Sequence, residues 1–535
     1  MRQDPPADLT IINYSEPQSL DPAIVTAQPD MRIVPGMFEG LTRADPKTGR
    51  AIPALAERWE LSPDGRTYTF HIRTNLVWST GEPIRAADVV YSWIRTLAPA
   101  TASDYAGQLF YVKNAEAFNS GKTNDTAVGV TALDPFTVRV ELNHPTVFFL
   151  DICAMPMASV VPRQTIEKFG DSWITARPLP ASGPYELDFW RLNDKVRLRK
   201  NPRYWDAANT QSAIIDLLPI GSASTALNLY IRGQVDVVWD KELVPTELLD
   251  VLLPRPDFHT FTYLGTYFIR FNVTRKPFDD ARVRKALALA IDKRRIVERI
   301  THGGEQPASS LVPNGTANYT SPPGLGYDPA LARQLLAEAG FPGGKNFPRM
   351  EYMFNAPAGG AKIHEQIAIE LQQMWRDNLG VDIELRQLEM QVYLTEQNQL
   401  HYDLSRSSWI GDYNDANTFL NLFVTKDGNN RTGWSNPRYD DLIRKANQIT
   451  DVPAREKLFQ DAETILVRDE LPVIPLFFYE GINYFDTNKI EGIYTNIVDL
   501  HPLQSIRRIH SKKETGRNER SLTELTQHEI RNTQP

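Results

Sequence analysis

One stretch decides the fold class of this chain: Ile363-His-Glu-Gln-Ile367-Ala-Ile-Glu-Leu371-Gln-Gln-Met374-Trp-Arg-Asp-Asn-Leu379-Gly380-Val381-Asp-Ile383-Glu-Leu385. Its apolar residues recur every three or four positions up to Met374, as on one face of a helix. From Val381 they alternate with polar residues, as in a half-buried strand. A helix that leads through a glycine into a strand is typical of α/β proteins. The stretch therefore predicts an α/β fold.

The same two periods recur in the rest of the chain. A helical stripe over residues 283–291 follows Asp279 and Asp280, which are suitable N-cap residues. Strands are predicted at residues 68–72, 136–142, 381–385 and 400–404. Because helices and strands alternate throughout, they belong to one α/β architecture.

The length and composition limit the classes of protein to consider. A chain of 535 residues is too long for one hydrophobic core and should divide into two or three domains. With 41% apolar residues and a net charge of −8, it lacks the clustered basic face of a nucleic-acid binder. No apolar run approaches the ~20 residues of a membrane-spanning helix. The single cysteine, Cys153, excludes an internal disulfide framework and a cysteine-rich metal site.

The two ends differ in character from the rest of the chain. Residues 1–10 contain no hydrophobic signal core, so we expect either a cytoplasmic protein or one whose signal peptide has been removed. Residues 508–535 are polar and highly charged and predict a disordered tail.

No group of residues predicts catalysis. His364-Glu365 lacks the second histidine of a zinc-protease helix, and Gly343-Gly344-Lys345 is an incomplete phosphate loop. The acid pairs at 279–280 and 440–441 fit helix caps better than a glycosidase dyad. We therefore expect no enzyme activity, no metal and no cofactor.

A second stretch, Arg406-Ser-Ser-Trp409-Ile-Gly-Asp412-Tyr413-Asn-Asp415, predicts a binding site. It places a cation, two large aromatic residues and a carboxylate close together. A carboxylate among aromatic rings is costly to desolvate unless a positive group pairs with it. A surface acid in an ordinary turn is the alternative interpretation.

An ordered series of short motifs extends over about residues 10–505. The motifs are Pro17-Gln-Ser-Leu-Asp21-Pro22, Met37-Phe-Glu39-Gly-Leu41, Leu55-Ala-Glu57-Arg-Trp59, Tyr68-Thr-Phe70-His-Ile-Arg73, Val77-Trp78-Ser, Asp88-Val-Val-Tyr91-Ser-Trp93, Ser182-Gly-Pro-Tyr185, Asn201-Pro-Arg-Tyr204-Trp205, Asn272-Val-Thr-Arg-Lys276-Pro-Phe278-Asp-Asp-Ala-Arg282-Val-Arg284-Lys-Ala286, Leu335-Leu-Ala-Glu338-Ala-Gly340 and the 409–412 region. In this order they resemble the oligopeptide- and dipeptide-binding proteins of ABC importers, which are extracellular solute-binding proteins of family 5.

This resemblance implies a three-lobed periplasmic-binding-protein-like fold, with two main lobes that close on a cleft and an extra inserted domain. The expected boundaries are residues 1–40, 165–262 and 480–507 for lobe I, residues 41–164 for the inserted lobe II, and residues 263–479 for lobe III. Hinges are expected near residues 263–267 and 477–479, where Gly265 would tolerate unusual backbone angles.

The resemblance also implies a function. The protein would be the periplasmic component of an importer, a monomer that captures short peptides between two lobes and delivers them to an inner-membrane ABC permease. The peptide backbone would pair with protein strands, which gives affinity that does not depend on side chains.

Six residues match ligand-binding positions of the family. Asp412 matches the aspartate that binds the peptide's α-ammonium, and Arg406 matches an arginine available to a ligand carboxylate or, alternatively, a brace for an acid. The other four are aromatic, and each has a core residue as its alternative interpretation: Tyr105 near the peptide's amino end, Trp409 and Tyr413 around the first side-chain pocket, and Trp239 facing the ligand.

The chain departs from the family pattern at the far end of the site. The usual residues there are replaced by Thr26, Met390, Gln397 and the pair Asp240-Lys241. Ligand length and identity therefore stay open. Alternatives are a muropeptide, an opine or sugar conjugate, haem or a metal chelate in the same fold, a peptide or glycan hydrolase, and a solute receptor that signals through a partner.

Overall fold

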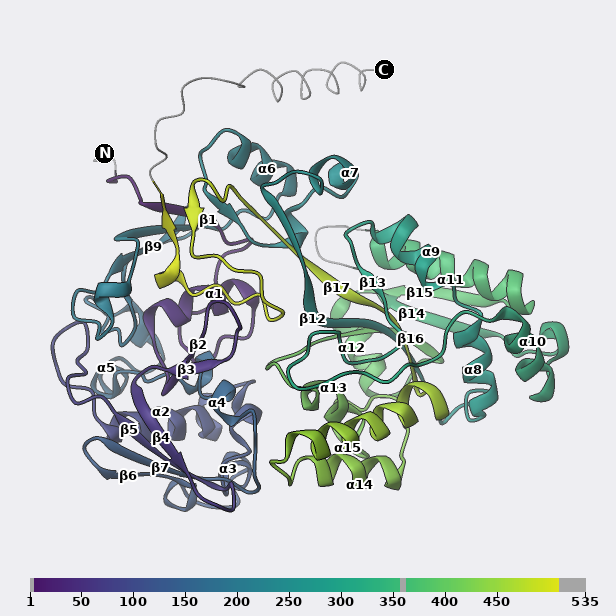
Figure 1. The fold of residues 1–535 in the computed structure, drawn as a ribbon, viewed down its shortest axis with the longest axis horizontal. Helices are drawn as coiled ribbons and strands as arrows, with labels where there is room; N and C mark the ends of the chain where they lie inside the picture. Colours follow the sequence, from purple (N-terminus) through teal and green to yellow (C-terminus); the bar gives the residue numbers. More distant parts are fainter. Residues whose placement is uncertain (1–3, 357–361, 510–535) are drawn as a thin grey trace.

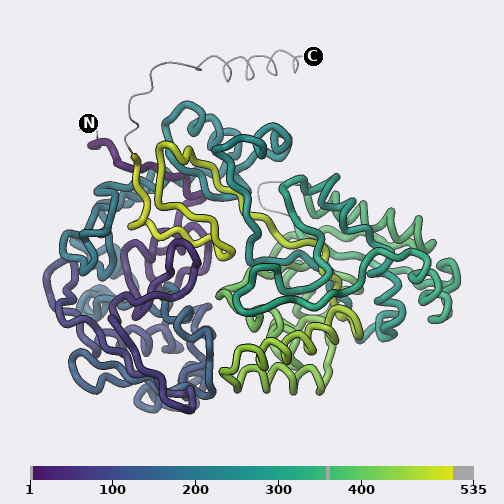
Figure 2. Tube along the Cα trace, viewed as in Figure 1, coloured from purple at the N-terminus to yellow at the C-terminus, as the bar shows by residue number. Residues whose placement is uncertain are grey.

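A computed structural model describes residues 4–356 and 362–509. Three lobes surround a central region: lobe II at the lower left of Figure 1, lobe I above it, and lobe III at the right. The tube in Figure 2 shows the chain passing from lobe I through lobe II and back, then into lobe III, with its yellow C-terminal part returning to lobe I. Strands and helices alternate throughout, so the predicted α/β class is confirmed.

Lobes I and III share one large sheet of eleven strands, in the order β15-β14-β16-β12-β17-β11-β1-β10-β9-β8, with β13 paired to β17. The lobe I strands are β1 (Leu9–Ile12), β8 (Tyr185–Arg191), β9 (Lys195–Lys200), β10 (Ile214–Leu218) and β11 (Val237–Val238). The lobe III strands are β12 (Phe258–Phe271), β13 (Gln306–Pro307), β14 (Met350–Asn355), β15 (Ile383–Leu388), β16 (Leu404–Ile410) and β17 (Val473–Phe485). The long strands β12 and β17 pair along most of their length and run from one lobe into the other.

Helices cover this sheet in both lobes. Lobe I has α1 (Gln28–Met37), α5 (Arg163–Phe169), α6 (Ala223–Ile231) and α7 (Leu249–Leu252), and a small ribbon of β18 (Ile490–Glu491) and β19 (Arg507–Arg508). Lobe III has α8 (Ala281–Leu289), α9 (Lys293–Ile296), α10 (Pro329–Glu338), α11 (Ile363–Leu379), α12 (Met390–Asn398), α13 (Asn417–Leu420), α14 (Pro437–Ala446) and α15 (Val452–Thr464).

Lobe II has its own sheet and its own core. Its strands are β2 (Thr42–Ala44), β3 (Ala51–Pro53), β4 (Ala56–Leu61), β5 (Thr67–Ile72), β6 (Val130–Asp134) and β7 (Thr137–Glu141), and its helices are α2 (Ala86–Leu97), α3 (Ala115–Asn119) and α4 (Phe149–Ile152). The sheet order is β4-β5-β7-β6. The alternation predicted at residues 68–72 is confirmed, because Tyr68, Phe70 and Ile72 are buried and pack into one cluster. The residue boundaries expected for the lobes stay a prediction.

The stretch that predicted the fold forms α11 and β15. The helix ends at Leu379, and Gly380 follows with a φ of +69°, a left-handed conformation that glycine adopts without strain. Strand β15 then pairs in parallel with β14. The apolar stripe packs into the main core of lobe III through Ile367, Leu371 and Met374. The predicted helix at residues 283–291 is α8, and Asp280 is its N-cap.

The strand predicted at residues 400–404 is misplaced. The observed strand β16 begins at Leu404 and extends to Ile410, through a segment that alternation did not select. Buried Ser405 and Ser407 explain the error. They lie in a strand enclosed by β12 and β14, where small polar residues fit and apolar alternation is not required.

Gly265 has a different role from the one expected. It is not among the glycines with positive φ, so unusual backbone angles do not explain it. A Cβ at this position would collide with Ile410 Cδ1 and lie 3.0 Å from Tyr479 Cδ2. A side chain at this position would therefore require Ile410 and Tyr479 to shift. The hinge itself stays a prediction.

The C-terminal end of the described chain is ordered as far as β19. Arg508, with which the predicted tail begins, pairs with Ile490 and bonds to Asp236. Residues 510–535, which contain the rest of the predicted tail, lie outside the described residues. No helix in the described part of the chain is long and apolar enough to cross a membrane.

Candidate functional site

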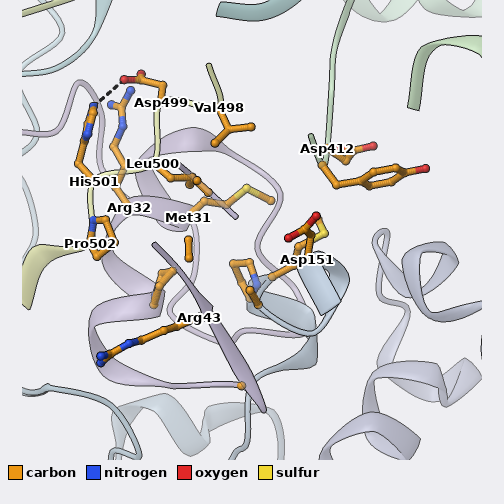
Figure 3. Close-up of a pocket in the computed structure, with 18 of the residues that line it drawn as sticks. Met31, Arg32, Arg43, Asp151, Asp412, Val498, Asp499, Leu500, His501 and Pro502 are labelled. Carbon is orange, nitrogen blue, oxygen red and sulfur yellow. Dashed lines mark hydrogen bonds and ion pairs between the residues drawn. The ribbon is translucent and has the colours of Figure 1, made fainter. Parts of the chain in front are cut away.

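A cavity of about 330 Å³ lies where the three lobes meet. Its walls come from α1 and residues 498–504 of lobe I, from segments within 39–49 and 151–159 of lobe II, and from residues 410–414 of lobe III. Figure 3 shows several of these side chains projecting into the same space. The volume is at the lower end of the range of ~300–1,000 Å³ for small-molecule sites, so a compact ligand group fits.

Asp412 enters this cavity from the end of β16. Gly411 N donates to Leu264 O at 2.7 Å, which fixes the chain as it leaves the sheet. A Cβ on Gly411 would lie 2.7 Å from Leu264 Cδ2, so the close approach needs glycine. Asp412 N then donates to Thr418 Oγ1 at 3.2 Å. The backbone is thus held on both sides of the carboxylate.

Two neutral donors from lobe II bond to the Asp412 carboxylate. Tyr105 Oη lies 3.3 Å from Oδ1, and Gln108 Nε2 lies 3.1 Å from Oδ2. Burial raises the pKa of Asp412 to about 6, although both hydrogen bonds act to lower it. None of the described lysines, arginines or histidines forms an ion pair with it. The cavity therefore contains a desolvated carboxylate that has donors but no counter-charge.

Tyr413 lines the cavity and also joins two lobes. Its ring stacks on Phe148 of lobe II at a centroid distance of 4.3 Å. Its hydroxyl donates to Asn417 Oδ1 at 2.7 Å and lies 3.3 Å from Tyr111 Oη. The side chain is only 6% exposed and packs with the lobe II core. It is therefore both a wall of the site and a contact between lobes.

Trp239 lines the lobe I side of the cavity just after β11. It is 1% exposed, and its ring stacks on His501 at 5.6 Å. Its indole Nε1 has no hydrogen-bond partner among the described residues. A buried N–H without an acceptor is costly, so this part of the cavity wall contains an unsatisfied polar group.

Arg406 and Trp409 lie on β16 but do not line the cavity. Arg406 Nη2 donates to Tyr479 Oη at 3.2 Å, and the guanidinium lies 4.8 Å from the Tyr267 ring centroid. It braces no acid among the described residues. The Trp409 indole packs against the lobe III core and lies 3.4 Å from Thr418 Oγ1. The structure thus brings together Asp412, Tyr105, Tyr413 and Trp239, and places Arg406 and Trp409 behind them.

Basic residues gather around Arg406. Lys241 Nζ lies 3.8 Å from the ring centroid of Tyr479, which also bonds to Arg406. Burial, together with the nearby charges of Arg406 and Lys241, lowers the pKa of His364 to about 3. The imidazole is therefore neutral at physiological pH, and two cations remain beside the aromatic rings.

Gln108 and Asp151 were missed by sequence reasoning. Gln108 follows Tyr105 by three positions in the same short turn, a spacing that could have indicated a shared target. Asp151 is on α4, far from the quoted motifs, and only the fold places it in the cavity wall. Of the departures noted above, Asp240 forms an ion pair with Arg32 at 3.2 Å and Gln397 is buried in side-chain hydrogen bonds.

The cavity has the chemistry of a binding site. The described cavity wall includes one histidine, His501. Its Nε2 lies 2.8 Å from Asp499 Oδ1 and 3.0 Å from Asn483 Nδ2. Neither partner is a serine, threonine or cysteine. No group of three potential metal ligands occurs among the described residues. The arrangement favours recognition of a cation by Asp412.

Comparisons with known proteins agree with this picture. The family model for bacterial extracellular solute-binding proteins, family 5, matches residues 50–431. The periplasmic oligopeptide-binding protein OppA of Salmonella typhimurium is 35% identical over 478 residues, which are 87% of this chain and 86% of that protein. A probable deoxycholate-binding periplasmic protein of Escherichia coli, YgiS, is 35% identical over 477 residues, 87% of each chain.

Solved structures show the same architecture. The murein tripeptide binding protein MppA of Escherichia coli superposes with a TM-score of 0.78 at 32% identity and covers 94% of this chain and 99% of that one. The three-lobed α/β fold predicted from the sequence is thereby confirmed.

Proposed function

The chain belongs to the bacterial extracellular solute-binding proteins of family 5, and on this premise we propose that it captures short peptides between its lobes and delivers them to an inner-membrane ABC permease. The observation that carries the peptide assignment is Asp412. Its carboxylate is desolvated, has two neutral donors and lacks a cation. The α-ammonium of a peptide supplies that cation, and a charge-assisted hydrogen bond of this kind contributes ~1.5–3 kcal/mol.

Other groups in the cavity match the rest of a peptide's first residues. Trp239 provides an aromatic wall on the lobe I side. Tyr413 provides an apolar wall for the first side chain. Tyr105 orients the Asp412 carboxylate through its hydroxyl. Trp409 supports this wall from the core behind it.

The far end of the peptide would meet the basic region around Arg406. Arg406 and Lys241 both contact Tyr479, and neither forms an ion pair with a described acid. Neither cation lines the cavity, so this contact requires a peptide that begins at Asp412 and extends beyond the cavity to Tyr479. This assignment gives Arg406 its role as the partner of the ligand's carboxylate.

Peptide capture needs lobes that can separate. Strands β12 and β17 connect lobes I and III, and their register shifts between Thr262 and Thr266. Residues 263–267 and 477–479 are the proposed hinge, and the lobe boundaries given above are the proposed moving units. Relatives named as periplasmic support action in that compartment.

A bile acid, the ligand in the name of one relative, fits this cavity poorly. Deoxycholate is an anion, whereas the unpaired group in the cavity is a carboxylate. Bringing two like charges together in a partly desolvated site is unfavourable. The electrostatics therefore favour an amine-bearing ligand.

Calorimetric titration with a mixed tripeptide library and its N-acetylated counterpart tests the proposal. We expect the free library to bind and acetylation to weaken binding roughly 10- to 150-fold. Asp412→Asn should weaken binding of the free library by a similar factor and leave the acetylated library unaffected.

Asp382→Asn is the matched control. Its carboxylate is 77% exposed and pairs with Arg376 on the surface of lobe III, so it removes the same charge far from Asp412. Native affinity is expected for this variant. If both libraries bind equally well, α-ammonium recognition is wrong, and if neither binds, peptide capture is wrong.

A further inference from the structure

We propose that Asp151 is a second cation-binding group of the cavity and that it selects peptides whose first residue has a basic side chain. This inference rests on the proposed function. It specifies which peptides bind, through a residue that sequence analysis did not identify. Asp412 would hold the α-ammonium while Asp151 holds the side-chain cation of the same residue.

Asp151 reaches the cavity from lobe II. It lies on the short helix α4, and both it and Asp412, which comes from lobe III, line the cavity (Figure 3). Its Oδ1 accepts a hydrogen bond from Ala51 N at 2.8 Å, and its Oδ2 has no described hydrogen bond. Burial raises the pKa of this carboxyl, and Asp415 adds to the rise while Arg50 opposes it. One oxygen is thus anchored and the other is available.

The basic groups of the cavity wall already have partners. Arg32 pairs with Asp240 at 3.2 Å, and Arg43 pairs with Asp206 at 2.7 Å. His501 lies 2.8 Å from Asp499. Among the described residues that line the cavity, Asp412 and Asp151 are carboxylates that form no ion pair. Two carboxylates of the cavity wall, those of Asp412 and Asp151, therefore lack a positive partner among the described residues.

A separate observation is that the wall of this cavity contains a second polar group without a partner. The Trp239 indole N–H is buried, lines the cavity and lacks an acceptor. The wall beside Asp151 is apolar, since Met155 and Pro156 follow it. A lysine side chain suits this surface because its methylenes pack on apolar atoms while its ammonium reaches a carboxylate. Both carboxylates line the same cavity of about 330 Å³.

Three tripeptides test the inference by calorimetry: Lys-Ala-Ala, norleucine-Ala-Ala, and the first peptide with its ε-amine acetylated. All three have a free α-amino group and a similar stem. We expect the lysine peptide to bind native protein at least about tenfold more tightly than the other two. In Asp151→Asn this preference should disappear while norleucine-Ala-Ala keeps its native affinity.

Asn retains an oxygen that can accept from Ala51 N, so the variant preserves the anchoring hydrogen bond. Asp412→Asn is the contrasting variant, which should weaken all three peptides together. Equal binding of the three peptides to native protein would overturn this inference and leave peptide capture standing. A preference that persists in Asp151→Asn would also overturn it. If none of the peptides binds, the proposed function and this inference both fail. The acetyl-lysine comparison needs no variant, so the test does not depend on how Asp151→Asn folds.

Discussion

Asp412 and Asp415 belong to one loop after β16, yet their surroundings are opposite. Asp415 is 4% exposed and has a built-in counter-charge. Arg455 bonds to both of its oxygens, with Nη1–Oδ2 at 2.7 Å and Nη2–Oδ1 at 2.8 Å. Among the described residues, the Asp412 carboxylate accepts hydrogen bonds from the hydroxyl of Tyr105 and the amide of Gln108. One carboxylate has its counter-charge in the folded chain, and under the proposed function a ligand supplies the counter-charge of the other.

The difference shows how a structural carboxylate can be told from a ligand-binding one: the first has a cation partner within the protein, and the second does not. A buried carboxylate with a bidentate arginine stabilises the loop, because removing either partner leaves an uncompensated charge. A buried carboxylate that lacks such a partner lowers stability while the protein is empty, and it recovers that free energy on binding a cation. Sequence proximity alone does not distinguish the two, since both lie in the same short motif.

The largest expected effect comes from removing the built-in cation. Arg455→Met should lower the free energy of unfolding by about 3–5 kcal/mol, because Asp415 would stay buried without its partner. Urea denaturation of the ligand-free protein measures this loss. Arg444→Met is the control, since Arg444 is 57% exposed and its pair with Asp441 contributes little. A loss below ~1 kcal/mol for Arg455→Met would contradict the assignment.

Giving Asp412 a built-in cation should make it resemble Asp415. Gln108→Lys places an ammonium beside Oδ2, which lowers the pKa of Asp412 and occupies the carboxylate. Peptide affinity should fall by about 1.5–3 kcal/mol in a calorimetric titration. Gln108→Met, which removes the hydrogen bond without adding charge, is the comparison. Unchanged affinity in Gln108→Lys would show that the ligand does not use Asp412.

Removing the charge at Asp412 should stabilise the empty protein. The folded pKa of about 6 lies above the value of 3.8 for a free aspartate, so the folded state holds the proton more tightly. Ionisation therefore costs stability as pH rises from about 4 to about 6, and the cost stays constant above that. At pH ~7.5, Asp412→Asn should raise the free energy of unfolding by about 1–2 kcal/mol, with almost no change at pH ~4. Urea denaturation at the two pH values checks this, and an equal effect at both would contradict it.

The smallest expected effect concerns the hydroxyl that supports Asp412. Tyr105→Phe removes the hydrogen bond to Oδ1 and raises the pKa of Asp412 further. Peptide affinity should fall by about 0.5–1.5 kcal/mol at neutral pH. Because binding needs the ionised carboxylate, affinity is lost as pH falls through about 6, and in the variant this loss should begin at higher pH. Tyr111→Phe, which contacts Tyr413 and not Asp412, should leave the pH profile unchanged.

The fold was predictable where local pattern and packing agree. The stripe of α11, the cap at Asp280 and the alternation of β5 are each visible in a few residues, and each is present in the structure. Strand β16 was misplaced because its buried residues include Ser405 and Ser407, which a search for apolar alternation does not find. A strand enclosed on both sides by others is determined by its neighbours, which lie far away in sequence.

The site was predictable only in part. Four of the six expected residues line the cavity, namely Asp412, Tyr105, Tyr413 and Trp239. The family resemblance identified these four, and local sequence pattern alone did not. Arg406 lies earlier on β16 than Ile410, which does line the cavity, and Arg406 contacts Tyr479 instead. Asp151 and Gln108 come from lobe II, and only the docking of lobes brings them to the same cavity as Asp412. Such long-range contacts have no local signal.

The stacking of Tyr413 on Phe148 has a consequence for how tightly the protein holds any cargo. The contact joins two lobes without involving a ligand, so it helps set what fraction of empty molecules is already shut. The apparent dissociation constant equals the intrinsic one divided by that fraction. Loosening the ring pair would thus weaken every cargo by a common factor and leave their ranking intact. If the proposals above hold, the aromatic pair adjusts the overall strength of retention, while the nearby acids decide which cargo is preferred.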